Sequence, residues 1–245
     1  MKNYIQQNKE RFFEELFSLL RIPSISAKPE HKEDMYRCAR RLTELLKEAG
    51  ADRADVYETA GHPVVFGSKD MGADKTVLVY GHYDVQPPEP LEKWRTDPFE
   101  PVIAKDPNNG EEAIYCRGAN DDKGQLYMHV KAFRELLAKG ELKHNVKFIF
   151  EGEEEIGSPS LPKWMEKNKD LLKADICLVS DTRMTSAFRR SLCSSTQAGS
   201  EGLPISSSPS KMNFTLCFRR PFLNRNSKAF RCMNSCPLSS LAPRQ

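Results

Sequence analysis

The chain has 245 residues, of which 39% are hydrophobic and 29% are charged, and its formal net charge is +3. This length suits one large domain or two small ones, and the composition excludes a fibre or a wholly disordered protein. No stretch has the roughly 18 uncharged apolar residues of a membrane-spanning helix, and the polar start MKNYIQQNKE lacks the apolar run of a secretory signal. We therefore expect a cytoplasmic protein without membrane contact.

Two helices are predicted near the start of the chain. Apolar residues recur at helical spacing over residues 2–20, and Pro23 ends this pattern. The same spacing predicts a second helix over residues 29–49, followed by Gly50 at the position where helices often end in a left-handed residue. Further helices are predicted over residues 123–137 and 161–168.

Strand patterns lie between these helices. They cover residues 54–59, 63–67, 76–80, 113–116, 146–151 and 176–179. Strands that alternate with helices predict an α/β fold with a mostly parallel central sheet flanked by helices, and the apolar runs TVLVY, VKFIF and ICLV indicate strands buried on both faces. In such sheets ligands bind at the carboxyl ends of the strands.

Metal-binding types of side chain follow four of these strands. They are His82 and Asp84, then Asp121 and Asp122, then Glu151, Glu153, Glu154 and Glu155, and finally Asp181. One acidic loop alone is usually solvated surface. Four acidic loops at one sheet edge would repel one another unless a cation neutralised them. One imidazole among carboxylates suits zinc, manganese or cobalt better than calcium.

Each group has an available role in such a centre. His82 offers an imidazole nitrogen, and Asp84 lies on the same side of an extended chain, where it can hold the other ring nitrogen. Asp121 can bridge two metals. Of the tandem Glu154 and Glu155, one can ligate while the other accepts a proton from water. The remaining acidic residues, Asp122, Glu151 and Glu153, are expected to be solvated or to lie behind the ligands.

Four motifs in the chain resemble those of the zinc metallopeptidases of the carnosinase and bacterial M20 dipeptidase group. They are GHYDVQP (81–87), RGANDDKGQ (117–125), EGEEEIGS (151–158) and VSD (179–181). The resemblance covers roughly residues 1–184 and includes Trp94 and Asp97-Pro98-Phe99. It implies a phosphorylase/hydrolase-like catalytic domain with a dinuclear zinc site that hydrolyses the amide bond of dipeptides or N-acylated amino acids.

The resemblance also implies a role for each site residue. It makes four residues zinc ligands: His82, Asp121 (bridging), Glu155 and Asp181. His82 and Asp181 would share one ion, and Glu155 would bind the other. Glu154 matches the general base, and Asp84 matches the acid that orients the ligand histidine. The family also places a cis peptide after the bridging aspartate, here Asp121-Asp122.

The resemblance does not continue beyond Thr182. Residues 1–181 hold 27 Lys and Arg against 33 Asp and Glu, whereas residues 182–245 hold 10 against 1. We expect a catalytic-domain portion over residues 1–182 and a disordered Ser/Arg-rich tail over residues 183–245, produced by a frameshift or mis-prediction. The lid domain, with its homodimer interface, is expected to be absent. The family's C-terminal histidine ligand also has no counterpart, because the last histidine is His144, so we expect impaired activity.

Other interpretations remain open. The alternative to an enzyme is a catalytically inactive metal-binding fragment with no enzymatic role. The basic tail favours nonspecific contact with polyanions, and no specific nucleic acid is expected as a partner. Dipeptides, acyl-amino acids and acyl-diamines are all open as substrates, and manganese or cobalt can replace zinc.

Overall fold

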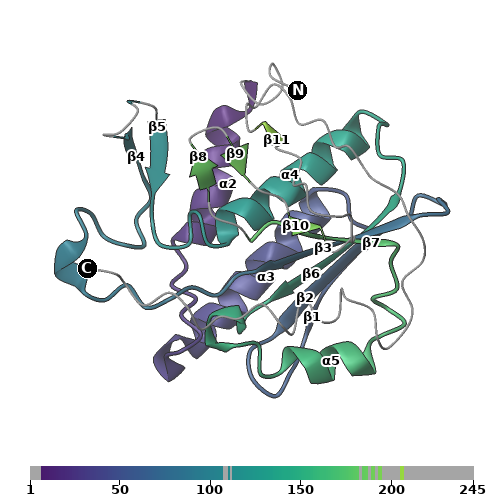
Figure 1. Cartoon of the computed structure of the whole chain (residues 1–245), viewed down its shortest axis with the longest axis horizontal. Helices are drawn as coiled ribbons and strands as arrows, with labels where there is room; N and C mark the ends of the chain where they lie inside the picture. Colours follow the sequence, from purple (N-terminus) through teal and green to yellow (C-terminus); the bar gives the residue numbers. More distant parts are fainter. Residues whose placement is uncertain are drawn as a thin grey trace.

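A computed structural model describes residues 7–106, 110 and 112–181, together with the backbone of four short strands between residues 184 and 206 (Figure 1). The side chains of the predicted tail lie outside the described residues. The predictions of a frameshift and of an absent lid domain concern that same part of the chain. The division into residues 1–182 and 183–245 therefore stays a prediction.

A six-stranded sheet forms the centre of the fold, with strand order β1-β2-β6-β3-β7-β10. Its strands are β1 (Arg53–Tyr57), β2 (Val64–Lys69), β3 (Thr76–His82), β6 (Asn145–Glu151), β7 (Ile176–Val179) and β10 (Cys193–Ser194). The middle strand β3 runs parallel to both β6 and β7, whereas β2 is antiparallel to β1 and β6, and β10 is antiparallel to β7. Consequently β1, β3, β6 and β7 point in one direction, which confirms the predicted mostly parallel sheet.

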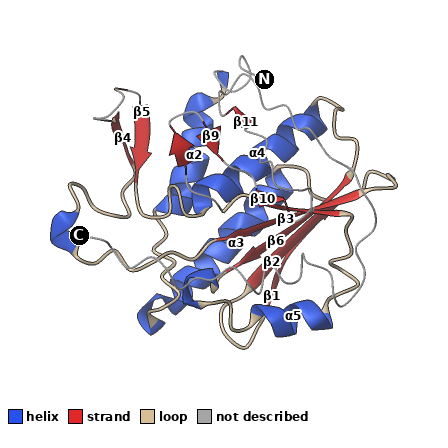
Figure 2. Ribbon diagram, in the orientation of Figure 1, coloured by secondary structure: helices blue, strands red, loops and turns tan. Residues whose placement is uncertain are grey.

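Helices cover both faces of this sheet (Figure 2). The helices are α2 (Lys9–Leu20), α3 (Lys32–Glu48), α4 (Lys123–Ala138) and α5 (Leu161–Lys167), with 3-10 turns η1 (Pro29–His31), η2 (Leu91–Lys93) and η3 (Glu154–Ile156). Apolar residues of α2, α3 and α4 pack in one cluster with one face of the sheet, and α5 packs in a second cluster with the other face. The predicted α/β fold is therefore confirmed.

The middle strand shows why its residues form a buried strand. Successive side chains of a strand point to opposite faces. Val77 and Val79 accordingly join the cluster under α2–α4, while Leu78 and Tyr80 join the cluster under α5. A strand covered on both faces needs apolar residues at successive positions, as the run TVLVY predicted.

One predicted strand does not belong to this sheet. Strand β5 (Glu112–Tyr115) pairs only with β4 (Val102–Lys105), which the sequence analysis missed, and together they form a separate two-stranded hairpin (Figure 2). Tyr115 is 40% exposed. A short strand that pairs with its neighbour in the chain can remain at the surface, so its residues need no cover on both faces.

The ends of the predicted helices differ slightly from the expectation. The second helix begins with the turn η1 at Pro29 and continues as α3. Gly50 after it has φ of +99°, the predicted left-handed end.

Within the described residues, no helix is long and apolar enough to cross a membrane. Beyond residue 183, β8 (Met184–Ser186), β9 (Arg189–Arg190) and β11 (Ile205–Ser206) form a small sheet.

Candidate metal centre

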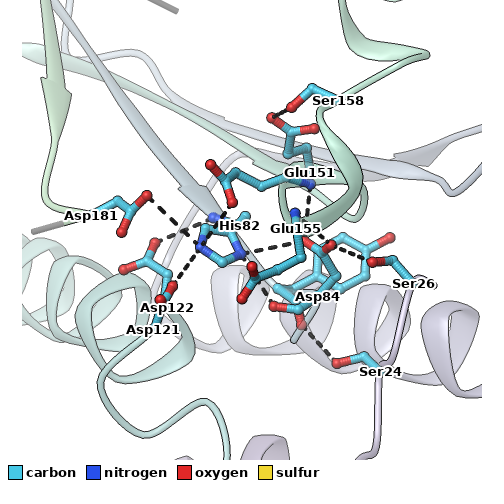
Figure 3. A network of polar contacts seen from close by, with 12 residues as sticks. Ser24, Ser26, His82, Asp84, Asp121, Asp122, Glu151, Glu155, Ser158 and Asp181 are labelled. Atoms are coloured by element: carbon cyan, nitrogen blue, oxygen red, sulfur yellow. Dashed lines mark hydrogen bonds and ion pairs between the residues drawn. The ribbon is translucent and has the colours of Figure 1, made fainter. Parts of the chain in front are cut away.

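His82, the last residue of β3, is the fully buried centre of the candidate site. Its ring atom Nε2 lies 3.0 Å from Asp121 Oδ1 and 3.9 Å from both Glu154 Oε2 and Asp181 Oδ2. Figure 3 shows carboxylates from several separate loops turned toward this one imidazole. The structure thus brings the predicted ligands together around His82.

The sheet explains how most of these residues meet. Strands β3, β6 and β7 are parallel neighbours, so their carboxyl ends lie at one edge of the sheet. Glu154 and Glu155 begin η3 just after β6, and Asp181 follows β7. These positions agree with the predicted strand-end loops.

Asp121 arrives by a different route from the one predicted. The strand before it, β5, lies in the separate hairpin, so Asp121 does not follow a strand of the central sheet. It lies two residues before α4, and α4 packs its buried Leu126 and Val130 in the same cluster as β3. The helix therefore carries this loop to the sheet edge. The peptide Asp121-Asp122 is cis, as the resemblance implied.

Two groups of side chains have the spacing of metal ligands. The first is His82, Asp121 and Glu155, and the second is His82, Glu154 and Asp181; the ligand atoms within each group lie within 4.8 Å of one another. The second group places Glu154, the predicted general base, beside the predicted ligand Asp181. The roles of these residues stay predictions, but their proximity makes a metal centre geometrically feasible.

Asp84 connects the histidine to the loop of the two glutamates. Its carboxylate is fully buried; Oδ1 lies 3.3 Å from His82 Nδ1 and accepts a hydrogen bond from the Glu154 N–H at 3.2 Å. Oδ2 accepts from the Ser26 hydroxyl at 2.6 Å and from the Glu155 N–H at 3.0 Å. The backbone oxygen of Asp84 is also 3.1 Å from His82 Nδ1. Both of these oxygen atoms can accept a hydrogen bond from Nδ1, and Nε2 is the ring nitrogen that faces the carboxylate cluster, so a metal on Nε2 would leave the hydrogen on Nδ1.

Three further acidic residues are buried behind the ligands: Asp122, Glu151 and Glu153. Each accepts a hydrogen bond: Asp122 from the His82 N–H (3.2 Å), Glu151 from the Tyr80 hydroxyl (2.6 Å) and Glu153 from the His62 N–H (3.0 Å). Of the two expected placements, solvated or behind the ligands, the structure shows the second. Their carboxylates satisfy backbone and side-chain donors of the site loops, which a buried carboxylate requires.

The electrostatics of the cluster favour the binding of a cation. Burial and the neighbouring carboxylates raise the pKa values of Glu155 and Asp181, and burial raises the pKa of Glu154 to about 7 with a further contribution from Asp181. Burial alone would lower the pKa of His82, but hydrogen bonds to Asp121 and Asp84 raise it well above 6.5. A divalent cation among these oxygens would oppose the upward shifts of the acids, so the donor set fits a bound metal.

Sequence reasoning missed two contacts of the site. Gln86 Nε2 donates to Glu155 Oε2 at 2.7 Å. Its position in the motif, two residues after Asp84 and four after His82 on the same side of an extended chain, was a usable signal. Ser26, which donates to Asp84, lies far away in the sequence and carried no such signal.

Comparisons of the sequence with known proteins agree with this geometry. The model of peptidase family M20/M25/M40 matches residues 78–203. A cysteinylglycine-S-conjugate dipeptidase of Corynebacterium striatum is 34% identical over 176 residues, covering 71% of this chain and 37% of that protein. A human Beta-Ala-His dipeptidase is 30% identical over 217 residues, covering 80% of this chain and 41% of that protein.

Solved structures show the same likeness. An M20 family metallo-carboxypeptidase from Sulfolobus solfataricus has a TM-score of 0.63 at 40% identity, over 70% of this chain and 37% of that one. Human carnosine dipeptidase 1 has a TM-score of 0.66 at 29% identity, over 76% and 41%. The chain thus spans about two-fifths of the length of these relatives. The family model matches more than half of the residues, and the motifs and the cluster of His82 with carboxylates agree with it. The chain therefore belongs to peptidase family M20/M25/M40.

Proposed function

We propose that this chain carries the metal-binding part of a metallopeptidase active site that hydrolyses the amide bond of dipeptides or N-acylated amino acids. The observation that carries the proposal is the convergence of buried His82 with the carboxylates of Asp121, Glu154, Glu155 and Asp181. The relatives described above, a cysteinylglycine-S-conjugate dipeptidase and a Beta-Ala-His dipeptidase, support small peptides as the substrate class.

Four residues would hold the metal: His82, Asp121, Glu155 and Asp181. Two zinc ions are proposed, with manganese or cobalt as chemically similar occupants of this nitrogen and oxygen donor set. Metal bound there would polarise the substrate carbonyl and lower the pKa of water. The upward pKa shifts of Glu155 and Asp181 support cation binding, because a divalent cation would oppose the burial and the repulsion from Asp121 that raise the pKa of both acids.

Glu154 is proposed as the general base. Its side chain is only 16% exposed, and its Oε2 lies 3.9 Å from His82 Nε2. Burial raises its pKa to about 7, which suits a group that must both accept and release a proton near neutral pH. Glu154 takes the proton of the attacking water and returns it to the amine that leaves. Asp84 keeps the His82 ring and the Glu154 backbone in place during this transfer.

One observation favours a second candidate function, which is metal binding without turnover. Among the described residues, both groups with ligand spacing use His82 as their imidazole, so two ions cannot each have three ligands of their own from these groups. A single bound ion would leave Glu154 with a weaker driving force for proton transfer. Under this alternative the chain binds one metal and hydrolyses nothing.

The experiment combines metal content with turnover in the purified chain. Elemental analysis after loading with zinc gives the number of ions, and hydrolysis of a dipeptide panel with added zinc or manganese gives the activity. Glu154→Gln is expected to keep the metal and to lower turnover by about 10²–10⁴-fold, because it removes the base and retains the shape. Metal without turnover in the unaltered chain would support the second candidate. A chain that binds no metal would refute both.

A further inference from the structure

The residues that follow α2 contact the end of β3 from the side opposite the ligands. The Ser24 hydroxyl donates to the Tyr83 carbonyl at 2.7 Å, and the Val85 N–H donates to the Ser24 carbonyl at 2.9 Å. Ser26 then donates its hydroxyl to Asp84 Oδ2 at 2.6 Å. Figure 3 shows Ser24 and Ser26 on the far side of Asp84 from the carboxylate cluster. We call residues 19–26 the strap.

The strap also contacts the loop of Asp121 through Lys123. The ammonium group of Lys123 is completely buried, and it donates to the carbonyls of Leu19 at 3.0 Å and Ile22 at 2.7 Å. These carbonyls lie at the C-terminal end of α2, where the helix dipole favours a positive charge. Lys123 is the first residue of α4, directly after Asp121-Asp122. The strap therefore joins the loops that bear His82 and Asp121.

Ser26 is the strap residue that reaches the site itself. Its side chain and that of Asp84 are both buried, so water does not readily replace their hydrogen bond. Asp84 Oδ2 has Ser26 and the Glu155 N–H as its donors, while Oδ1 faces His82 and the Glu154 N–H. Loss of the serine hydroxyl would remove one of the donors that keep the carboxylate plane in this orientation.

We propose that Ser26 is a positioning residue of the metal centre, acting through Asp84 on the orientation of His82 and on the loop of Glu154 and Glu155. The inference rests on the proposed function, because it concerns the same metal centre. It involves a segment outside residues 78–203, the part that the family model matches. Partners behind a metal ligand commonly change metal affinity by about 10–100-fold, and Ser26 acts one residue further away, so we expect about tenfold.

Cobalt(II) is the probe, because its visible spectrum reports the number and arrangement of ligands. The full chain is titrated with cobalt as wild type, Ser26→Ala, Ser26→Thr and Ser18→Ala. Ser26→Ala is expected to bind cobalt about tenfold more weakly, with altered absorption bands. Ser26→Thr, which keeps the hydroxyl, should restore the affinity and the spectrum. Ser18→Ala is the matched control, because Ser18 lies on α2 and its hydroxyl donates to the Glu15 carbonyl instead.

The outcomes separate this inference from the proposed function. Wild-type affinity and spectrum in Ser26→Ala would overturn the inference and leave the proposed function intact. Equal weakening in Ser18→Ala and Ser26→Ala, or a Ser26→Ala chain that is unfolded without metal by circular dichroism, would make Ser26 a residue of general stability and overturn its positioning role. Failure of the wild type to bind cobalt would refute the proposed function first, and the inference with it.

Discussion

Replacement of Asp84 by asparagine tests the hydrogen-bond network under the metal centre. Asp84 has donors at both carboxylate oxygens: His82 and the Glu154 N–H at Oδ1, and Ser26 and the Glu155 N–H at Oδ2. An amide can supply only one acceptor oxygen, so its NH₂ group must face one of these donor pairs. The better choice is the Oδ2 side, because the Ser26 hydroxyl can rotate and accept, which leaves the Glu155 N–H without a partner.

The structure gives an approximate size for this effect. One unsatisfied buried N–H costs about 1–3 kcal/mol, and the lost charge on the acceptor weakens the remaining bonds, so we expect Asp84→Asn to destabilise the metal-loaded chain by about 2–4 kcal/mol. In the metal-free chain the loss is smaller, because removal of one negative charge also relieves repulsion with Glu154 and Glu155. Metal affinity should fall by about 10–100-fold.

Urea unfolding with and without zinc, together with a zinc competition titration, measures these quantities for the wild type and Asp84→Asn. The informative comparison is the stabilisation that zinc adds, since a ligand that binds only the folded chain stabilises it in proportion to its affinity. Asp84→Asn with unchanged zinc affinity and the same zinc-induced stabilisation would refute the role of Asp84 as the support of His82.

Two further predictions concern stability away from the ligands. Burial alone would raise the pKa of Glu15, but its hydrogen bond and ion pair with Lys131 lower the pKa below 4.5. Glu15 therefore contributes stability that is present above its unfolded pKa and is lost as the pH falls through its folded pKa. In urea titrations, Glu15→Gln should show a smaller loss of unfolding free energy below about pH 4.5 than the wild type, and an equal loss would contradict this reasoning. Gly124→Ala would place a Cβ 2.0 Å from the Ala119 carbonyl oxygen, which belongs to the backbone and cannot rotate away. We therefore expect the free energy of unfolding, measured in urea, to fall by about 1–3 kcal/mol. A variant as stable as the wild type would show that the loop moves freely.

Local patterns were sufficient to predict most of the fold. The continuous apolar run of β3 and the helical spacing in α3 each reflect burial along a single element, so they are visible in a few successive residues. The placement of β5 was wrong for a related reason. A short strand pattern records that a segment is extended, but it does not record which strand becomes its partner.

For the site, too, local sequence predicted some features and the tertiary structure was needed for others. Three of the predicted ligands, His82, Glu155 and Asp181, lie at or just after the ends of strands that are parallel neighbours. Their positions at the ends of predicted parallel strands were enough to predict that they meet at one sheet edge, whereas the strand order came from the structure. The resemblance added their individual roles, which stay predictions. Asp121 was expected at the same edge for a reason that the structure corrects, since α4 places it there.

The amino-acid sequence by itself thus determined the α/β layers and the set of candidate ligands, because periodicity and short motifs are properties of neighbouring residues. Only the tertiary structure decided that Asp84 also holds the backbone of the glutamate loop, that Ser26 supports Asp84, and that Lys123 ties α2 to α4. Each of these contacts depends on hydrogen-bond geometry between segments far apart in the chain. Such geometry exists only after burial against the sheet has brought the segments together.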